Sequence, residues 1–212
     1  MKSYWVKTPS HIQKLFPKRI WSLPSTPNAI YLTFDDGPIP EVTPWVLDTL
    51  KKHEAKATFF CIGDNVRKHP EIFKQITAQG HTVGNHTFHH KNGWKTKYEA
   101  YLEDCKLCED VMNIGGEEAS KLFRPPYGKL TARQSKALRQ QGYKIIMWDV
   151  LSADFDTALS EEQCLRNVIE NIAPGSIVVF HDSLKARLRL EYALPKVLAY
   201  ISEKGFTCEG IQ

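Results

Sequence analysis

Five segments of the chain combine acidic, histidine and arginine side chains in spacings that suit hydrolytic chemistry. Each follows or ends a run of apolar, β-branched or aromatic residues, which is the pattern of a buried strand. Polar groups at the carboxyl ends of neighbouring parallel strands gather at one edge of the sheet, where α/β folds build their active sites. We therefore expect one site built from the segments 33–38, 86–90, 124–128, 148–155 and 180–183.

His86 and His90 are four residues apart, so that on a helical turn both imidazoles would face the same way. Together with one carboxylate they make a three-ligand metal site that leaves a position open for water, which is the pattern of catalytic sites. Asp36, in the Asp-Asp-Gly segment at the end of a predicted strand, is the natural third ligand. The alternative is a pair of surface histidines without a metal, and the nearby strand-terminal carboxylate favours the metal site.

The neighbouring carboxylates of Asp35 and Asp36 repel each other, and both stay ionised at the end of a buried strand only if cations lie close. A metal at Asp36 and the guanidinium of Arg124 at Asp35 would meet that need. His181 directly follows another buried strand and is expected at the same edge. With Asp35 it provides the proton acceptor and the proton donor that hydrolysis requires. An ordinary turn at Asp-Asp-Gly-Pro and a structural histidine are the alternatives.

Strands and helices alternate along the chain, which predicts right-handed crossovers and a largely parallel sheet. Thr131 and Ser160 are expected to cap the helices that follow them. The Pro-broken segment 1–28 is expected to be an irregular strap packed on a single catalytic domain, residues 29–212. Predicted strands cover 29–34, 57–62, 81–84, 122–124, 144–150, 176–180 and, more weakly, 206–208. Predicted helices cover 44–54, 65–79, 97–113, 131–141, 160–172 and 190–203.

Length and composition exclude several classes of protein. The 212 residues are fewer than the roughly 250 of a usual eight-unit barrel. A net charge of +4 that is spread along the chain argues against nucleic acid as a partner, and no apolar run reaches the ~18 residues of a membrane span. The five cysteines, an odd number, suit a reducing compartment. Lysines and prolines interrupt the N-terminal region, so we expect no signal peptide and a cytoplasmic location.

The four motifs at 33–37, 86–90, 124–128 and 181 together resemble the motif set of the polysaccharide deacetylases, the NodB-homology or carbohydrate esterase family 4 that includes chitin and peptidoglycan deacetylases. The resemblance extends over about residues 29–206. It implies a single-domain α/β fold, a distorted (β/α)7 barrel, and its seven units explain the short chain. It also implies hydrolysis of an N-acetyl group on an amino sugar.

The resemblance also implies a role for each matching residue. Asp35 would be the general base and His181 the general acid, while Arg124 would orient Asp35. The backbone N–H of Tyr127 would help to hold the oxyanion. A divalent metal ion, usually Zn2+ and sometimes Co2+ or Ni2+, would be bound by Asp36, His86 and His90.

One motif departs from the family pattern. Many members carry Asp-x-x-Asp-Trp after the fifth strand, where the first Asp tunes the acid histidine, and the aligned residue here is Leu151. Asp149 or Asp154 could take that role, and the position of Asp154 in the motif favours it. Aromatic side chains that could pack against a sugar are Trp94, Trp148 and Phe155, with core packing as the alternative for Trp94.

Three other functions stay open at this point. A non-haem Fe(II) oxygenase also uses two histidines and one carboxylate, but is typically an all-β protein and needs no acid and base pair. A catalytically weak carbohydrate-binding relative would be consistent with Leu151. A related barrel amidase would act on a small non-sugar amide. The expected partner is an N-acetylated carbohydrate of unspecified length. The sequence does not determine the oligomeric state, for which a monomer is plausible.

Overall fold

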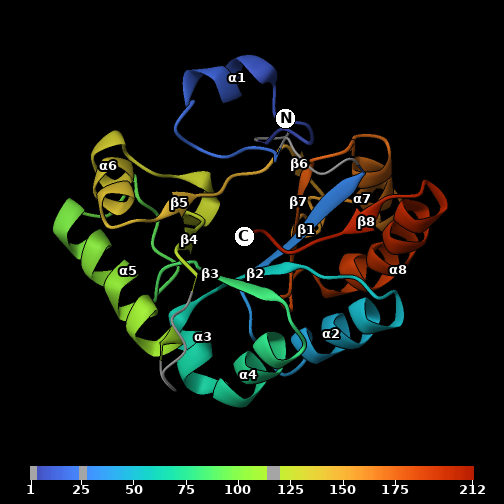
Figure 1. Cartoon of the computed structure of the whole chain (residues 1–212), viewed down its shortest axis with the longest axis horizontal. Helices are drawn as coiled ribbons and strands as arrows, with labels where there is room; N and C mark the ends of the chain where they lie inside the picture. The colour runs from blue at the N-terminus through green and yellow to red at the C-terminus, as the bar shows by residue number, and fades with distance from the viewer. Residues whose placement is uncertain (1–3, 24–27, 114–119) are drawn as a thin grey trace.

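The centre of the structure is a parallel sheet that curls into an incomplete barrel (Figure 1). The computed structural model describes residues 4–23, 28–113 and 120–212. Strands follow one another in the order β5-β4-β3-β2-β1-β7-β6, and β8 pairs with β1. All of these pairs are parallel, which confirms the predicted distorted (β/α)7 barrel. The strands are β1 (Ala29–Asp35), β2 (Thr58–Cys61), β3 (Thr82–Asn85), β4 (Leu122–Phe123), β5 (Lys144–Ile145), β6 (Val150–Leu151), β7 (Ile177–His181) and β8 (Thr207–Cys208).

Helices surround the sheet on its outer side (Figure 1). Thr131 caps α6 with a reciprocal capping box, and Ser160 Oγ accepts a hydrogen bond from the backbone N–H of Gln163 at the start of α7. The helices are α1 (Ser10–Leu15), α2 (Thr43–Lys52), α3 (Gly63–Lys68), α4 (Pro70–Ala78), α5 (Tyr98–Met112), the 3-10 turn η1 (Pro126–Gly128), α6 (Ala132–Gln140), α7 (Glu161–Ile169) and α8 (Arg187–Glu203).

The long helix predicted over 65–79 is wrong in one respect, because the structure divides it at His69. Pro70 begins α4, and a proline disfavours helical geometry in the residue before it. His69 accordingly has φ −130° and ψ 55°.

The single strand predicted over 144–150 is also wrong. The structure has β5 and β6 there, at opposite edges of the sheet. The backbone between them pairs instead with the N-terminal segment: Met147 N–H donates to Ile20 O at 2.7 Å, and Thr8 N–H donates to Asp149 O at 2.8 Å. The apolar run is therefore buried at the seam between two strands.

The N-terminal segment, residues 4–23, lies across this seam. Lys7 bridges to Val150 of β6, Ile20 to Ile146 beyond β5, and the Lys7 ammonium lies 2.7 Å from Asp149 Oδ2. This segment contains α1, a regular element where the sequence predicts none. The two edges of the open barrel are thus joined by the start of the chain.

Strand β1 lies in the middle of the sheet and is buried along its whole length. Phe34 stacks between Phe59 of β2 and Phe180 of β7, with ring centroids 5.0 and 6.1 Å apart. Phe34 and Phe180 are also paired in register, so β1 and β7 end at the same level with Asp35 beside His181. No helix in the described part of the chain is long and apolar enough to cross a membrane.

Candidate active site

The polar segments meet at the carboxyl ends of the central strands. Asp35, the last residue of β1, is paired in register with His181, the last residue of β7. His86 follows the last residue of β3, and Arg124 follows β4. Parallel register thus places Asp35, His181, His86 and Arg124 at one end of the barrel, where the sequence predicts them.

Asp36, His86 and His90 form a cluster that suits a metal ion. Their ligand atoms lie within 4.8 Å of one another. Asp36 Oδ1 is 3.3 Å from His90 Nε2 and 3.8 Å from His86 Nε2. The structure therefore brings together the three side chains that the sequence singles out as ligands.

The chemistry of these donors fits a divalent cation. Asp36 Oδ1 is buried and has no hydrogen-bond partner among the described residues, which is costly unless a cation is bound. Burial is the largest influence on His86 and lowers its pKa to about 4, against the opposing effect of Asp35. Burial also lowers the pKa of His90. Both imidazoles are therefore neutral near pH 7, as metal ligation requires.

The backbone carbonyl of Arg124 fixes the tautomer of His86. It lies 2.8 Å from His86 Nδ1 and accepts that proton, which leaves Nε2 unprotonated and directed at Asp36. A hydrogen bond on the far nitrogen is the usual way in which proteins orient a ligating histidine.

The expectation that His86 and His90 share a helical turn is wrong, because residues 86–90 form a loop. Thr87 and His90 have φ values of 63° and 54°, in the left-handed region. Asn85 Oδ1 accepts the N–H of Thr87, and Thr87 Oγ1 accepts the N–H of Lys91. Side-chain bonds to the backbone, in place of helical periodicity, turn the two imidazoles toward Asp36.

Asp104 of α5, which the sequence gives no reason to select, holds the same loop from behind. Its Oδ1 accepts the backbone N–H groups of Phe88 at 2.8 Å and His89 at 2.9 Å. Its Oδ2 lies 2.6 Å from Nδ1 of His89. This buried carboxylate therefore anchors the residues between His86 and His90 from the helix side.

The carboxylate of Asp35 is buried and paired with a fully buried arginine. Arg124 Nη1 donates to Asp35 Oδ1 at 2.6 Å and to Thr33 Oγ1 at 2.6 Å, and Nη2 donates to Met147 O at 3.0 Å. Burial alone would raise the pKa of Asp35, but Arg124, His86 and His181 together lower it below its ordinary value. Asp35 is therefore ionised, and Arg124 fixes its direction.

His181 is held by both oxygens of Asp154. Its Nδ1 lies 2.7 Å from Asp154 Oδ1, and its backbone N–H donates to Oδ2 at 2.7 Å. Burial works to lower the pKa of His181, but Asp154 outweighs it and the pKa is raised to about 9. The other acidic candidate, Asp149, points elsewhere, to Lys7 and Ser176. Leu151 is buried and apolar.

Asp182 is a second carboxylate that the sequence gives no reason to select. Its Oδ1 accepts the N–H of Gly37, and its Oδ2 accepts the hydroxyl of Thr43. A Cβ at Gly37 would lie 1.9 Å from Asp182 Oδ2, so only glycine fits after Asp36. Burial raises the pKa of Asp182 to about 7. The contact fixes the chain immediately after Asp36.

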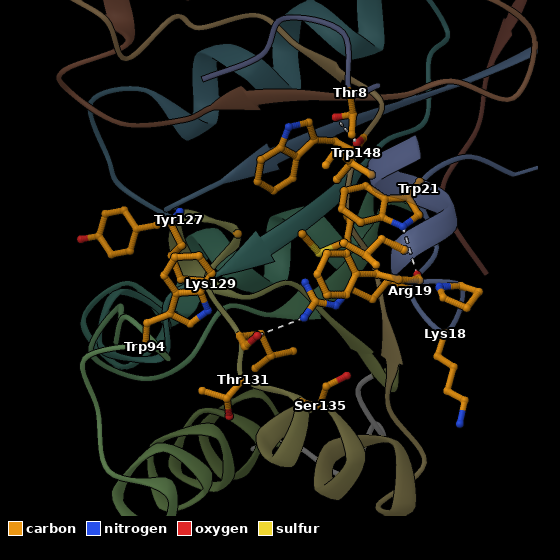
Figure 2. A pocket seen from close by; sticks show the side chains of 18 of the residues that line it. Thr8, Lys18, Arg19, Trp21, Trp94, Tyr127, Lys129, Thr131, Ser135 and Trp148 are labelled. Carbon is orange, nitrogen blue, oxygen red and sulfur yellow. Dashed lines mark hydrogen bonds between the residues drawn. The ribbon is translucent and has the colours of Figure 1, made fainter. Parts of the chain in front are cut away.

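The aromatic candidates lie on two sides of the reaction centre. Tyr127 has φ 59° and its ring centroid is 4.6 Å from that of His90. Phe155 packs edge-on against His181 at 5.1 Å. Trp148 lines a cavity beside the centre, and Trp94 lies at its edge with 64% of its surface exposed, which excludes core packing for Trp94. Figure 2 shows Tyr127, Trp94 and Trp148 around this cavity.

Comparison with known proteins agrees with this arrangement. The sequence profile of the polysaccharide deacetylase family matches residues 23–146. A peptidoglycan-N-acetylglucosamine deacetylase of Bacillus cereus is 38% identical over 177 residues, which cover 83% of this chain but 64%, less than two thirds, of that protein. A chitooligosaccharide deacetylase of Azorhizobium caulinodans is 36% identical over 160 residues, covering 73% of this chain and 74% of that one.

The solved structures give the same result. A crystal structure of a peptidoglycan N-acetylglucosamine deacetylase in complex with 4-naphthalen-1-yl-N-oxidanyl-benzamide superimposes with a TM-score of 0.88 at 33% identity. The match covers 96% of this chain and 95% of that one. It thus extends over nearly the whole barrel, including the part after residue 146 where β7 ends in His181.

Proposed function

This chain belongs to the polysaccharide deacetylase family, and on that premise we propose that it is a metal-dependent hydrolase that removes N-acetyl groups from an amino-sugar-containing carbohydrate. The observation that carries the proposal is the convergence, at one end of the barrel, of the Asp36, His86 and His90 cluster with Asp35, which pairs with Arg124, and His181, which pairs with Asp154. The reaction takes an N-acetyl amide and water to acetate and a free amine.

Asp36, His86 and His90 would hold the metal ion, for which we propose Zn2+, with Co2+ and Ni2+ as the alternatives. A divalent ion at this position supplies Lewis acidity to the attacking water and to the amide oxygen. The two imidazoles and one carboxylate provide three ligands and leave room for water, as in catalytic zinc sites.

Asp35 takes the proton from water as the water oxygen attacks the amide carbon. Arg124 keeps the Asp35 carboxylate ionised and aimed at the centre. The backbone N–H of Tyr127 donates a hydrogen bond to the amide oxygen as negative charge develops on it. Protonated His181 then gives its proton to the nitrogen, so that the amine leaves as a neutral group when the C–N bond breaks. Trp94, Trp148 and Phe155 are proposed to pack against the sugar.

Acetate release tests this proposal. The metal-loaded protein is assayed with N-acetylglucosamine oligomers, with peptidoglycan fragments and with small non-sugar amides. Release from the sugars and not from the small amides supports the proposal, and release from the small amides alone supports the amidase instead.

The parallel α/β barrel and the family membership do not favour an Fe(II) oxygenase. A cytoplasmic location stays a prediction.

We expect Asp154→Asn to shift the alkaline limb of the pH–rate profile to lower pH and to lower kcat. The pKa of His181 is raised to about 9 chiefly by Asp154, so protonated His181 persists to high pH and activity is lost as the pH rises through that value. Without the carboxylate the histidine loses its proton earlier. Asp149→Asn is the matched control, because Asp149 does not contact His181. An unshifted alkaline limb in Asp154→Asn, or an equal shift in the control, would contradict the role of Asp154.

Asp104→Asn is expected to weaken metal binding by about 10- to 100-fold, the usual range when a residue that orients metal ligands is altered. An asparagine keeps the size of the side chain but weakens the three bonds that hold Phe88 and His89. Metal affinity is measured by competition with a chromogenic chelator. Asp110→Asn, an exposed change on the same helix, serves as the control. Equal affinities in both variants would show that the loop needs no anchor from α5.

A further inference from the structure

A cavity of about 740 Å3 lies between the N-terminal segment and the start of α6, beside the reaction centre. Figure 2 shows Tyr127 and Trp94 at one end and Trp21 and Arg19 at the other. Tyr127 also packs against His90, and the guanidinium of Arg124 lies 5.9 Å from the ring of Trp148 on the cavity wall. Through Tyr127 and Trp148 the cavity thus adjoins the proposed site of deacetylation, and its volume is large enough for a sugar unit with its substituents.

The wall of the cavity carries tryptophan side chains from distant parts of the chain: Trp5, Trp21, Trp94 and Trp148. Trp5 is 56% exposed and Trp94 64%, so each presents a broad apolar face to solvent. Aromatic side chains that combine an apolar face with a polar N–H are suited to the C–H faces and hydroxyl groups of a sugar ring. The aromatic lining thus favours a further part of a glycan substrate as the ligand of this cavity over a purely aliphatic molecule.

The charge of the cavity has a single sign. Its lining includes Lys18, Arg19, Lys129 and Arg139, and no carboxylate among the described residues. A cavity lined in this way attracts anions and concentrates them.

These cations have no anionic partner within the described chain. Arg19 donates to the carbonyl of Leu130 and lies over the ring of Phe16, and burial lowers its pKa. Lys129 lies 4.0 Å from the ring of Trp94, and Arg139 Nε is buried without a hydrogen-bond partner. Arg19, Lys129 and Arg139 are partly shielded from water, whereas Lys18 is exposed. Partly shielded cations without an anion are costly, so the gathering of these three favours a negatively charged ligand.

We propose that this cavity binds a carboxylate-bearing substituent of the glycan, so that the preferred substrate is an acidic N-acetylated glycan and not a neutral one. The inference rests on the proposed function and adds the substrate class. An arginine can hold a carboxylate through two parallel hydrogen bonds. Such a contact would fix the substituent, and with it the position of the glycan relative to the reaction centre. Neutral oligomers fill the aromatic surface but leave the cations unpaired.

The test compares two glycan fragments that differ in charge alone. One is a peptidoglycan tetrasaccharide with free carboxylates on its substituents, and the other is the same fragment with those carboxylates converted to amides. We expect kcat/KM for the acidic fragment to exceed that for the amidated one by about tenfold, which corresponds to about 1.4 kcal/mol. The ratio should fall as salt is added, since salt screens partly exposed charges.

Variants assign the effect to the cavity. In the double variant R19Q/R139Q we expect the ratio to fall to near one. R133Q is the matched control, because Arg133 lies on the same helix as Arg139 but faces Tyr98 and Glu99 outside the cavity; its ratio should stay at about ten. Because each ratio is measured within one preparation, a loss of folded protein in a variant cancels.

Calorimetric binding of the same two fragments to the metal-free protein gives the ratio without turnover. A ratio near one in the wild type, or a ratio that R19Q/R139Q leaves unchanged, overturns the inference. Equal acetate release from both fragments would sustain the proposed function and overturn the inference alone. Preferential binding of the acidic fragment without acetate release would sustain the inference about the cavity and overturn the proposed function.

Discussion

In Asp35→Asn, kcat falls by about 10³-fold, within the range that a positioned general base contributes, while the metal content stays that of the wild type. The amide cannot accept the proton of the attacking water, and the three metal-site side chains are untouched. Acetate release is measured at saturating substrate, with bound metal determined by elemental analysis. Release that persists undiminished would exclude Asp35 as the base. Asp110→Asn makes the same change at an exposed position and should leave kcat unchanged.

The same substitution should also lower stability. It leaves the fully buried guanidinium of Arg124 without its anion, and breaking a buried pair in this way costs about 3–5 kcal/mol. Because the pKa of Asp35 is held below its ordinary 3.8, its contribution to stability is present above that pH and is lost as the pH falls through the lower, folded-state value. When urea unfolding is measured as a function of pH, the free energy of unfolding should therefore decrease less toward acid pH in the variant than in the wild type.

The sequence predicts the ends of the central strands well because two signals coincide there. The buried run of β1 stops at Asp35 and that of β7 at His181, so hydrophobicity and chemistry change at the same residue. Parallel register then brings the two ends together without further information. The cluster of Asp36 with the histidines follows from the same rule, although the local geometry at 86–90 is a loop and not the predicted helical turn.

Other parts of the site depend on contacts that local patterns do not encode. Asp104 lies in the middle of an amphipathic helix, where an acidic residue ordinarily faces solvent, and only tertiary packing buries it against the loop. Asp182 becomes a partner of Gly37 because β1 and β7 are neighbours. The break in the run 144–150 arises because residues 4–23 compete for its backbone groups, and that pairing spans more than a hundred residues.

Asp36→Asn provides the sharpest contrast with Asp35→Asn, because the two adjacent carboxylates differ in what they contact. Asp36 has φ 85°, a left-handed conformation that asparagine tolerates well, so the substitution does not strain the backbone. Its Oδ1 has no hydrogen-bond partner among the described residues, although His90 Nε2 lies 3.3 Å away. We therefore expect the metal-free variant to be as stable as the metal-free wild type or more stable, since a half-buried carboxylate whose Oδ1 accepts no hydrogen bond is removed.

With metal present we expect the wild type to be more stable than Asp36→Asn. A ligand that binds only the folded state stabilises it, by about 2.7 kcal/mol at a concentration one hundred times its Kd, and this gain should appear in the wild type and in Asp35→Asn but not in Asp36→Asn. Acetate release should be lost in Asp36→Asn, and also in wild type treated with a chelator, where added Zn2+ restores it. Thermal unfolding of the three proteins with and without Zn2+ measures the effect. If Zn2+ stabilises Asp36→Asn as much as the wild type, Asp36 is not a ligand, and the buried oxygen needs another explanation.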